Sequence, residues 1–417
     1  MSSRLIKLLL SIGVIGIVVA SCTNATNHVG SRKQPVSPPS SNPYLPAGFL
    51  SSPGGPFIYD ASHRVIILHG VNAVYKHPPF VVYPASGKPY NFNAQDASEI
   101  ASLGFNVVRV GIIWEGAEPG TLKPNSKQVC SPTTPGKFNH IHQFNQAVLN
   151  NYVNKLIQTV DLLGKYHIYS LIDMHQDVFS QYFGGEGAPS WALCTNGLPR
   201  FHAKNRWSAA YITSKALWAA YSHFWNNNVV GNLQGNYDRV WAEIASRLKN
   251  NPWVLGYDLF NEPFSHLLLS ASPASHQAFD TQLECFYTGT AYAGTIAATA
   301  ASASCPPGDP PLGLIPQIRS VDPNHMIFYE PDGFVQDMNF ANLVLNFHIY
   351  CPARDKNGNP TNNSLCASAE AAAFTYRFKE RPLDATPAQP GGPAWFMSEF
   401  GATKDTVDLA RMTSLAD

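Results

Sequence analysis

Charged residues are scarce in this sequence of 417 residues, of which they make up only 13%. The 28 basic residues balance the 28 acidic ones, so the formal net charge is zero and no electrostatic argument favours nucleic acid as a partner. Hydrophobic residues reach 45%, and a chain of this length can bury the core of an α/β barrel of about 250 residues or more. The 12% of aromatic residues suits an extracytoplasmic protein that binds sugars or apolar ligands.

The N-terminal apolar run is too short to be a comfortable membrane span. Arg4 and Lys7 precede an apolar stretch over 8–20, which favours a secretory signal over residues 1–21. The stretch ends in Val-Ala-Ser-Cys, which resembles the lipobox of bacterial lipoproteins and predicts lipidation of Cys22, although an ordinary cleavage site would also fit. We therefore expect an exported protein, either a cell-envelope lipoprotein or a secreted one, with a flexible linker over 22–50 that is rich in Ser, Asn and Pro.

The cysteines lack the spacing of a zinc site, and no metal site is expected. Beyond Cys22 there are six, an even number that favours disulfides in an exported chain: Cys130, Cys194, Cys285, Cys305, Cys351 and Cys366. The pairs 285 with 305 and 351 with 366 close the shortest loops. The sequence leaves the full connectivity open.

Residues 51–417 contain seven apolar segments of strand length, separated by loops and helical patterns. They cover 65–72, 106–111, 168–173, 254–260, 326–330, 343–348 and 394–398. Strands that alternate with helices predict a parallel sheet, and seven such units predict a (β/α)₈ TIM barrel. The sequence ends soon after the seventh segment, so we expect a barrel that lacks its eighth strand.

Polar residues gather where these segments end. Asn261 and Glu262 follow the fourth segment, and Glu399 follows the seventh. A buried strand that runs into a carboxylate is costly unless the carboxylate has a task or a partner. Two glutamates at two strand ends predict retaining glycoside hydrolysis, in which one stays protonated as the acid and the other attacks as a carboxylate.

Other polar residues at the strand ends would support this pair. They are Arg109 after the second segment, His175 and Asp177 after the third, and His348 and Tyr350 after the sixth. A buried arginine needs carboxylate partners, so Arg109 is expected to orient Glu399. Asn261 is expected to hold the substrate 2-hydroxyl. Glu330 ends the fifth segment, and we expect it to be structural.

In this combination the residues resemble the family-five glycoside hydrolases. In that family the Asn-Glu pair ends the fourth strand and supplies the acid/base, and the Glu that ends the seventh strand is the nucleophile. The words over 173–177, 183–189 and 74–79 look like the endoglycoceramidase branch, which cleaves the β-glucosidic bond between a glycan and ceramide. The resemblance implies that Lys76, His175 and Asp177 contact the glucose next to that bond. The family's eighth strand with its sugar-stacking Trp, and the branch's C-terminal β-sandwich, are not found in the sequence.

Three functions follow as hypotheses. The first is hydrolysis of a glycolipid, the second is hydrolysis of a soluble or cell-wall β-glucan, and the third is an inactive, truncated sugar-binding lipoprotein. Two carboxylates and water suffice for the chemistry, so no cofactor is expected. The expected partners are the glycolipid or oligosaccharide and, through the anchor, a membrane surface, with the protein a monomer. Apolar residues near the acid could line a groove for acyl chains or belong to the core: Phe264, Leu267, Leu268, Leu269, Phe179, Tyr182 and Phe183.

Overall fold

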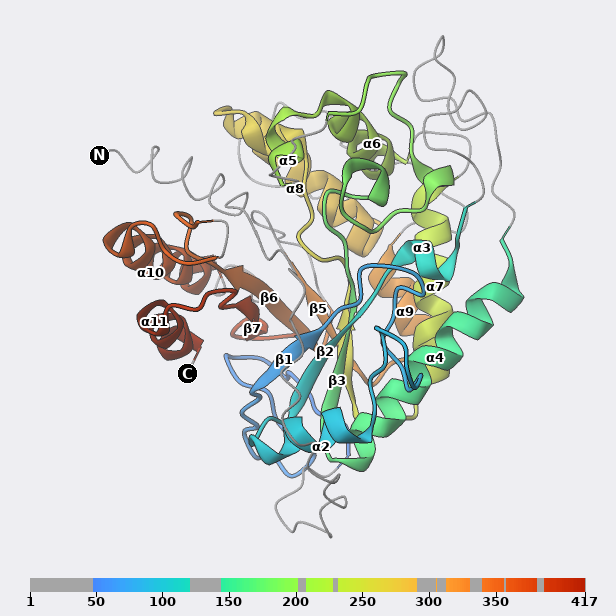
Figure 1. The fold of residues 1–417 in the computed structure, drawn as a ribbon, viewed down its shortest axis with the longest axis vertical. Coiled ribbons are helices and arrows are strands. Elements are labelled where there is room, and N and C mark those ends of the chain that lie inside the picture. The colour runs from blue at the N-terminus through green and yellow to red at the C-terminus, as the bar shows by residue number, and fades with distance from the viewer. Residues whose placement is uncertain are drawn as a thin grey trace.

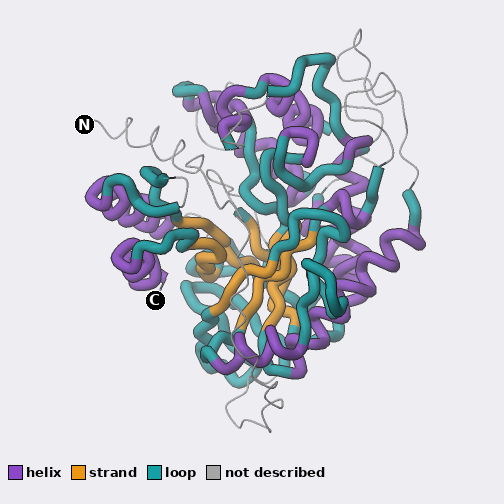
Figure 2. The backbone as a smooth tube through the Cα atoms, in the orientation of Figure 1, coloured by secondary structure: helices purple, strands orange, loops and turns teal. Residues whose placement is uncertain are grey.

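The computed structural model describes residues 48–120, 144–201, 208–227, 232–290, 305, 313–330, 340–355, 358–380 and 386–416. Seven parallel strands lie side by side in chain order and curl into a nearly closed barrel, as Figures 1 and 2 show. The strands are β1 (Gly70–Ala73), β2 (Val107–Ile112), β3 (Tyr169–Met174), β4 (Val254–Asp258), β5 (Met326–Tyr329), β6 (Leu343–Ile349) and β7 (Ala394–Phe400). The predicted TIM-barrel fold class is confirmed.

The central strands were readable from the sequence because they are buried on both faces. Every residue of β2, β3, β4 and β5 is buried, so each reads as a nearly continuous apolar run. Their predicted bounds agree with the structure to within about two residues.

The first strand differs from its prediction. The predicted segment covered 65–72, whereas β1 runs from Gly70 to Ala73. Val65 instead forms an isolated antiparallel bridge with Tyr59, and Ile67 is 59% exposed. Residues 65–68 are apolar because they pack at the N-terminal end of the barrel, where Ile66 and Leu68 contact a cluster formed by the first residues of the strands.

The same cluster shows how the barrel is closed at its N-terminal end. Leu50 and Ile58 from the segment before β1 are buried with Leu171, Leu255 and Phe328 of the strands. A buried Ser52 hydroxyl accepts hydrogen bonds from the Gln389 side chain and the Ala394 backbone. These contacts join residues 50–58 to β7 and close the N-terminal end of the barrel without an additional strand.

Helices cover the outside of the sheet (Figure 2). The helix α4 (Gln146–Lys165) shows why: Asn145 caps its N-terminus, and residues spaced three to four apart, such as Leu149, Val153, Leu156, Val160 and Leu163, form one buried stripe. The other α-helices are α2 (Ala94–Ser102), α3 (Trp114–Ala117), α5 (Ala209–Thr213), α6 (Lys215–Asn226), α7 (Leu233–Leu248), α8 (Pro273–Thr288), α9 (Leu314–Val321), α10 (Asn363–Glu380) and α11 (Thr406–Ala416). Three short 3₁₀ helices are η1 (Gln181–Phe183), η2 (Ser190–Ala192) and η3 (His266–Leu269).

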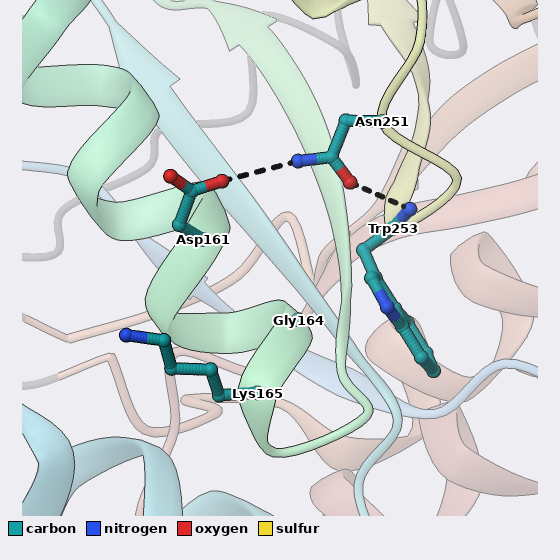
Figure 3. A pocket seen from close by; sticks show the side chains of 5 residues that line it. All are labelled: Asp161, Gly164, Lys165, Asn251 and Trp253. Atoms are coloured by element: carbon teal, nitrogen blue, oxygen red, sulfur yellow. Dashed lines mark hydrogen bonds between the residues drawn. The ribbon is translucent and has the colours of Figure 1, made fainter.

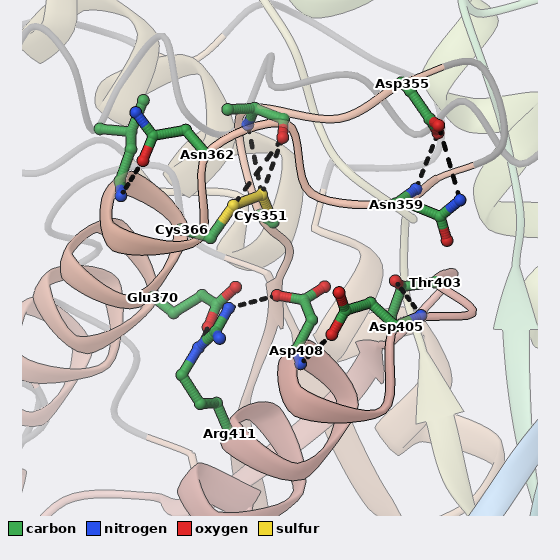
Figure 4. The surroundings of a disulfide bond; sticks show 12 residues. Cys351, Asp355, Asn359, Asn362, Cys366, Glu370, Thr403, Asp405, Asp408 and Arg411 are labelled. Atoms are coloured by element: carbon green, nitrogen blue, oxygen red, sulfur yellow. Dashed lines mark hydrogen bonds and ion pairs between the residues drawn. A yellow bond between two sulfur atoms is a disulfide. The ribbon is translucent and has the colours of Figure 1, made fainter.

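Two of the expected disulfides form. Cys285 pairs with Cys305, and Cys351 pairs with Cys366 (Figure 4). Cys194 is also disulfide-bonded, while Cys130 lies outside the described residues. The residues of the predicted signal and Cys22 likewise lie outside the described part of the chain. Among the described helices, none is both long and apolar enough to cross a membrane.

Candidate active site

The two predicted glutamates meet at the C-terminal end of the barrel. Glu262 follows β4 by a short loop and Glu399 lies on β7, three strands away in the sheet. One carboxylate oxygen of each, with a ring nitrogen of His348, lie within 4.8 Å of one another. Retaining glycosidases hold their two carboxyl groups about 5 Å apart, whereas inverting enzymes need more room for a water molecule. The spacing therefore fits a double displacement.

Glu399 is held as a carboxylate. The Arg109 guanidinium donates to its Oε1, and the Tyr350 hydroxyl donates to its Oε2 over 2.7 Å. Burial alone would raise the pKa of Glu399, but the charges of His348 and Arg109 outweigh it and lower the pKa well below its usual range. An ionised, oriented carboxylate is what a nucleophile at this position needs.

Glu262 has the opposite environment. Burial raises its pKa, and the hydrogen bond from His348, over 2.9 Å between Nδ1 and Oε1, only partly opposes that shift. Its side chain remains 15% exposed, so a ligand can reach it. Two carboxyl groups whose pKa values are pushed apart have the arrangement of an acid and a nucleophile.

Arg109 is the centre of a buried ionic network. Its guanidinium contacts Asp173 at 3.0 Å and Asp258 at 2.7 Å, besides Glu399, and it donates to Asn261 Oδ1 over 2.8 Å. The side chain is only 3% exposed, and the carboxylates around it raise its pKa although burial acts against that. The prediction that Arg109 orients Glu399 agrees with these contacts.

Asn261 is held from both sides of its amide. Its Nδ2 donates to the Gln176 carbonyl over 3.0 Å, while its oxygen accepts from Arg109. One Nδ2 hydrogen is left for a ligand, since the amide carries two. The predicted contact to a substrate hydroxyl stays a prediction.

A second cluster of polar side chains combines Lys76, which follows β1, with residues of the loop after β3. The Lys76 ammonium contacts Asp177, and lies 3.0 Å from Glu186 Oε1. His175 Nδ1 donates to Asp173 over 2.9 Å, and its buried Nε2 has no hydrogen-bond partner among the described residues and lies 3.8 Å from Asp177. The structure thus brings the three predicted glucose-contacting residues together.

Sequence reasoning missed several members of the site. Glu330 contacts Arg109, His348 and the Glu262 backbone, so its interpretation as structural was incomplete. The others that contact site residues are Gln176, Glu186, Asp173, Asp258, Asn346 and Ser398. A signal was present for Asp173 and Asp258, because a charged residue within an apolar strand is costly without a partner.

Of the three groups of possible metal ligands in the described residues, one contains the disulfide-bonded Cys351 and Cys366, and the other two lie in this site. These two are His175, Asp177 and Glu186, and the triad of His348 with the two glutamates. Protein cations already neutralise both groups, since Lys76 lies between the carboxylates of the first and Arg109 contacts the second. The carboxylates of both groups are therefore paired with cations of the protein itself.

The apolar residues near Glu262 belong mostly to the core. Phe264, Leu268, Phe179 and Phe183 are at most 4% exposed. Leu267, Leu269 and Tyr182 are partly buried against the same core. The acyl-groove interpretation is thus wrong for the first four.

An open hollow lies far from this chemistry, at the opposite end of the barrel. Figure 3 shows it between the end of α4 and the residues before β4, lined by Asp161, Gly164, Lys165, Asn251 and Trp253. It contains neither glutamate. The catalytic groups lie instead at the C-terminal ends of the strands, as expected for a TIM barrel.

Comparison with known families decides the classification. The model of the family "Cellulase (glycosyl hydrolase family 5)" matches residues 62–272, just over half of the 417 residues. This chain belongs to glycosyl hydrolase family 5. The predicted family is confirmed, and the family-five assignment agrees with the barrel and the carboxylate pair.

Relatives of this family-five chain include curated endoglycoceramidases. That of Cyanea nozakii is 29% identical over 229 residues, covering 50% of this chain and 40% of the relative. Endoglycoceramidase I of Rhodococcus hoagii is 29% identical over 230 residues, covering 54% and 39%. The aligned part of the chain thus spans about 40% of the length of each of these relatives.

A solved structure shares the fold. Endo-glycoceramidase II from Rhodococcus sp., in complex with a cellobiose-like imidazole, superimposes with a TM-score of 0.53 at 21% sequence identity. The match covers 86% of this chain and 72% of that one. It supports the barrel architecture of the family-five chain.

Proposed function

We propose that this protein is a retaining glycoside hydrolase that cleaves the β-glycosidic bond between a glycan and a lipid aglycone, as an endoglycoceramidase does. The observation that carries the proposal is the carboxylate pair within 4.8 Å, one member of which has a raised pKa and the other a lowered pKa. The family membership and the endoglycoceramidases among the relatives support it.

In the first step, Glu399 attacks the anomeric carbon and forms an ester bond to the sugar. The bond to the leaving-group oxygen breaks, and that oxygen takes the proton of Glu262. Tyr350 and Arg109 keep the nucleophile ionised and fixed until it reacts.

In the second step, Glu262 removes a proton from water, which attacks the same carbon. The ester bond to Glu399 breaks, and the sugar leaves with its configuration retained. Lys76, His175 and Asp177 are proposed to bind the glucose next to the scissile bond, where their side chains lie together. Asn261 is proposed to hold its 2-hydroxyl.

The structural support for a lipid aglycone is a set of partly or largely exposed apolar side chains on η3 and α5. Leu267 and Leu269 of η3 are partly buried, and Ile212 of α5, a helix that contacts η3, is 47% exposed. Apolar side chains near the leaving-group side would favour an acyl or sphingoid chain over a polar sugar.

The test is release of free glycan from a fluorescent lactosylceramide in detergent, by the purified protein and its Glu399→Gln variant. We expect release that the variant loses by at least about 10³-fold, because the nucleophile is gone. Release by both proteins alike would contradict the assignment of Glu399, and no release from a well-folded protein would contradict glycolipid hydrolysis.

A β-glucanase is the second candidate, because the matching family model is described as a cellulase. The same assay with a soluble mixed-linkage β-glucan separates the two. Cleavage of the glucan with no release from lactosylceramide would favour the glucanase. Sugar binding without either activity would favour the inactive sugar-binding protein.

We further propose that the protein is exported and anchored through Cys22. The support is the sequence alone, where a charged start and a short apolar run lead into Val-Ala-Ser-Cys. In bacterial expression, Cys22→Ser should move the protein from the membrane fraction to the soluble fraction and abolish palmitate labelling. Unchanged fractionation and labelling would contradict the anchor.

A further inference from the structure

The backbone at the proposed acid has an unusual conformation. Glu262 has φ of +45°, in the left-handed region that residues with a side chain adopt rarely. Its neighbour Pro263 adds a second restriction, because the residue before a proline favours an extended backbone. Such a conformation persists only where the surroundings impose it, and it is typical of functional positions.

One side chain holds the carbonyl side of this turn. Gln176 Nε2 donates to the carbonyl oxygens of Asn261 and Glu262, each over 2.9 Å. The Gln176 oxygen in turn accepts from the Tyr221 hydroxyl and the Phe179 backbone, both over 2.8 Å. Gln176 is 3% exposed, so its amide has a fixed orientation.

Another side chain holds the amide side. The backbone N–H of Glu262 donates to Glu330 Oε2 over 2.9 Å. The other oxygen of Glu330 lies 3.3 Å from Arg109 Nη2 and 3.3 Å from His348 Nε2. Because His348 contacts the Glu262 carboxyl through its Nδ1, Glu330 reaches the acid through both its backbone and its side-chain partner.

We propose that Gln176 and Glu330 are positioning residues that clamp Glu262 in its left-handed backbone and so direct its carboxyl toward the leaving-group oxygen. The inference rests on the proposed function, since it assigns Glu262 the role of acid. Gln176 contacts the acid through its backbone, Glu330 contacts it through its backbone and through His348, and neither side chain touches a reacting atom.

Substrates with different leaving groups distinguish a misplaced Glu262 carboxyl from a general loss of activity. A dinitrophenolate leaves without a proton, whereas an alkoxide such as that of a lipid needs the acid. Misdirecting Glu262 should therefore slow cleavage of an alkyl or lipid glycoside far more than formation of the glycosyl-enzyme from a dinitrophenyl glycoside. A displacement of about 1 Å at such a site can cost about 10²-fold.

The first variant is Gln176→Leu, which removes both donors at similar volume. Its matched control is Gln389→Leu, a buried glutamine whose Nε2 also donates to two carbonyls, those of Ser52 and Leu343, at the N-terminal end of the barrel strands. We expect Gln176→Leu to lose at least tenfold more activity on the lipid glycoside than on the dinitrophenyl glycoside. The control should lose stability alone and keep the wild-type ratio.

The second variant is Glu330→Gln. In either orientation of the new amide, its NH₂ group faces another donor. That donor is the Glu262 N–H in one orientation and the Arg109 and His348 cations in the other. The matched control is Asp238→Asn, a buried carboxyl on α7 with no partner for its oxygens in the described residues. Expected is the same selective loss for Glu330→Gln and none for the control.

Labelling with a 2-deoxy-2-fluoro dinitrophenyl glycoside counts the folded sites that can form the intermediate on Glu399. The rates of a partly misfolded variant can then be divided by its fraction of active sites. Equal losses on both substrates, or wild-type ratios in both variants, would overturn the clamp. If the wild-type protein cleaves neither substrate, the proposed function itself has failed, which is a distinct result.

Discussion

The neighbours of the two glutamates shift their pKa values in opposite directions. Glu399 lies against Arg109 and Tyr350, which favour its ionised form, while burial dominates at Glu262 and favours the protonated form. The proposed mechanism thus requires ionised Glu399 and protonated Glu262. It should fall at low pH as Glu399 takes up a proton, and at high pH as Glu262 loses one.

Tyr350→Phe tests the acid side of this profile. The hydroxyl donates to the carboxylate of Glu399 and so stabilises its charge, after the larger effects of His348 and Arg109. Its loss raises the pKa of Glu399, so the acidic limb of kcat/KM should move to higher pH. The measurement is the pH profile with a dinitrophenyl glycoside, and a limb that stays in place or moves down would disprove the assignment.

Lys76→Met tests the proposed glucose contacts. The ammonium bridges Asp177 and Glu186, and the pKa of Glu186 already stands at about 8 through burial and the nearby Asp177. Without Lys76 the two acids would share a proton and lose their fixed geometry. We expect KM to rise about tenfold with a smaller change in kcat. Lys165→Met, at the far end of the barrel, should leave both constants unchanged, and a wild-type KM in Lys76→Met would remove it from the binding site.

At the scale of elements, the loop after β6 is fixed next to the nucleophile. Cys351 follows Tyr350 directly and joins Cys366 on α10, and Arg411 of α11 contacts Glu370 of α10 and Asp408 (Figure 4). Arg354 lies over the Tyr350 ring, 4.7 Å from its centre. The disulfide thus ties the helix pair α10 and α11 to a residue that contacts Glu399.

Replacing Cys351 and Cys366 together by Ala should lower the free energy of unfolding by about 3 kcal/mol, the value for a loop of this length. It should also lower kcat, because Tyr350 loses its anchor. The matched control is the Cys285→Ala and Cys305→Ala pair, which closes a loop of 20 residues away from β6. Denaturant unfolding and kcat are measured on both. An equal effect on kcat in the control would refute the link to Tyr350.

At the scale of the whole molecule, Arg109 holds the barrel together at its catalytic end. Its guanidinium joins β2 to carboxylates from β3, β4 and β7, and to Glu330 after β5. Removing one partner of a buried ionic network leaves uncompensated charge, which typically costs about 3–5 kcal/mol.

Arg109→Met should therefore lower Tm by about 10 °C, as the four carboxylates repel one another. Part of that loss should be regained at lower pH, where protonation relieves the repulsion. Arg109→Lys keeps the charge but not the planar fork, so its loss should be smaller. Thermal unfolding at two pH values is the measurement. A Tm for Arg109→Met that is unchanged, or that falls further at low pH, would show that the network does not stabilise the barrel.

Strand prediction succeeded where burial was symmetrical. The segments that became β2 to β6 are apolar because helices cover one side and the barrel interior the other, while β7 was also found although most of its residues are only partly buried. The prediction of β1 failed because this strand is not buried on both faces: its Val71 is 39% exposed. The apolar residues before it pack instead against the cluster at the N-terminal end of the barrel.

The order of the strands could be predicted from the sequence, and so could the candidacy of the two glutamates and the arginine, because a charged residue at the end of an apolar strand needs a task or a partner. The contacts of Gln176 and Glu330 with the Glu262 backbone became visible in the folded chain. Gln176 is separated from Glu262 by 86 residues and Glu330 by 68, and although both stand among the polar residues at strand ends, nothing in the sequence shows which backbone groups they contact. Their function is a contact with the backbone of another segment, which arises only when the strands of a barrel bring their ends together.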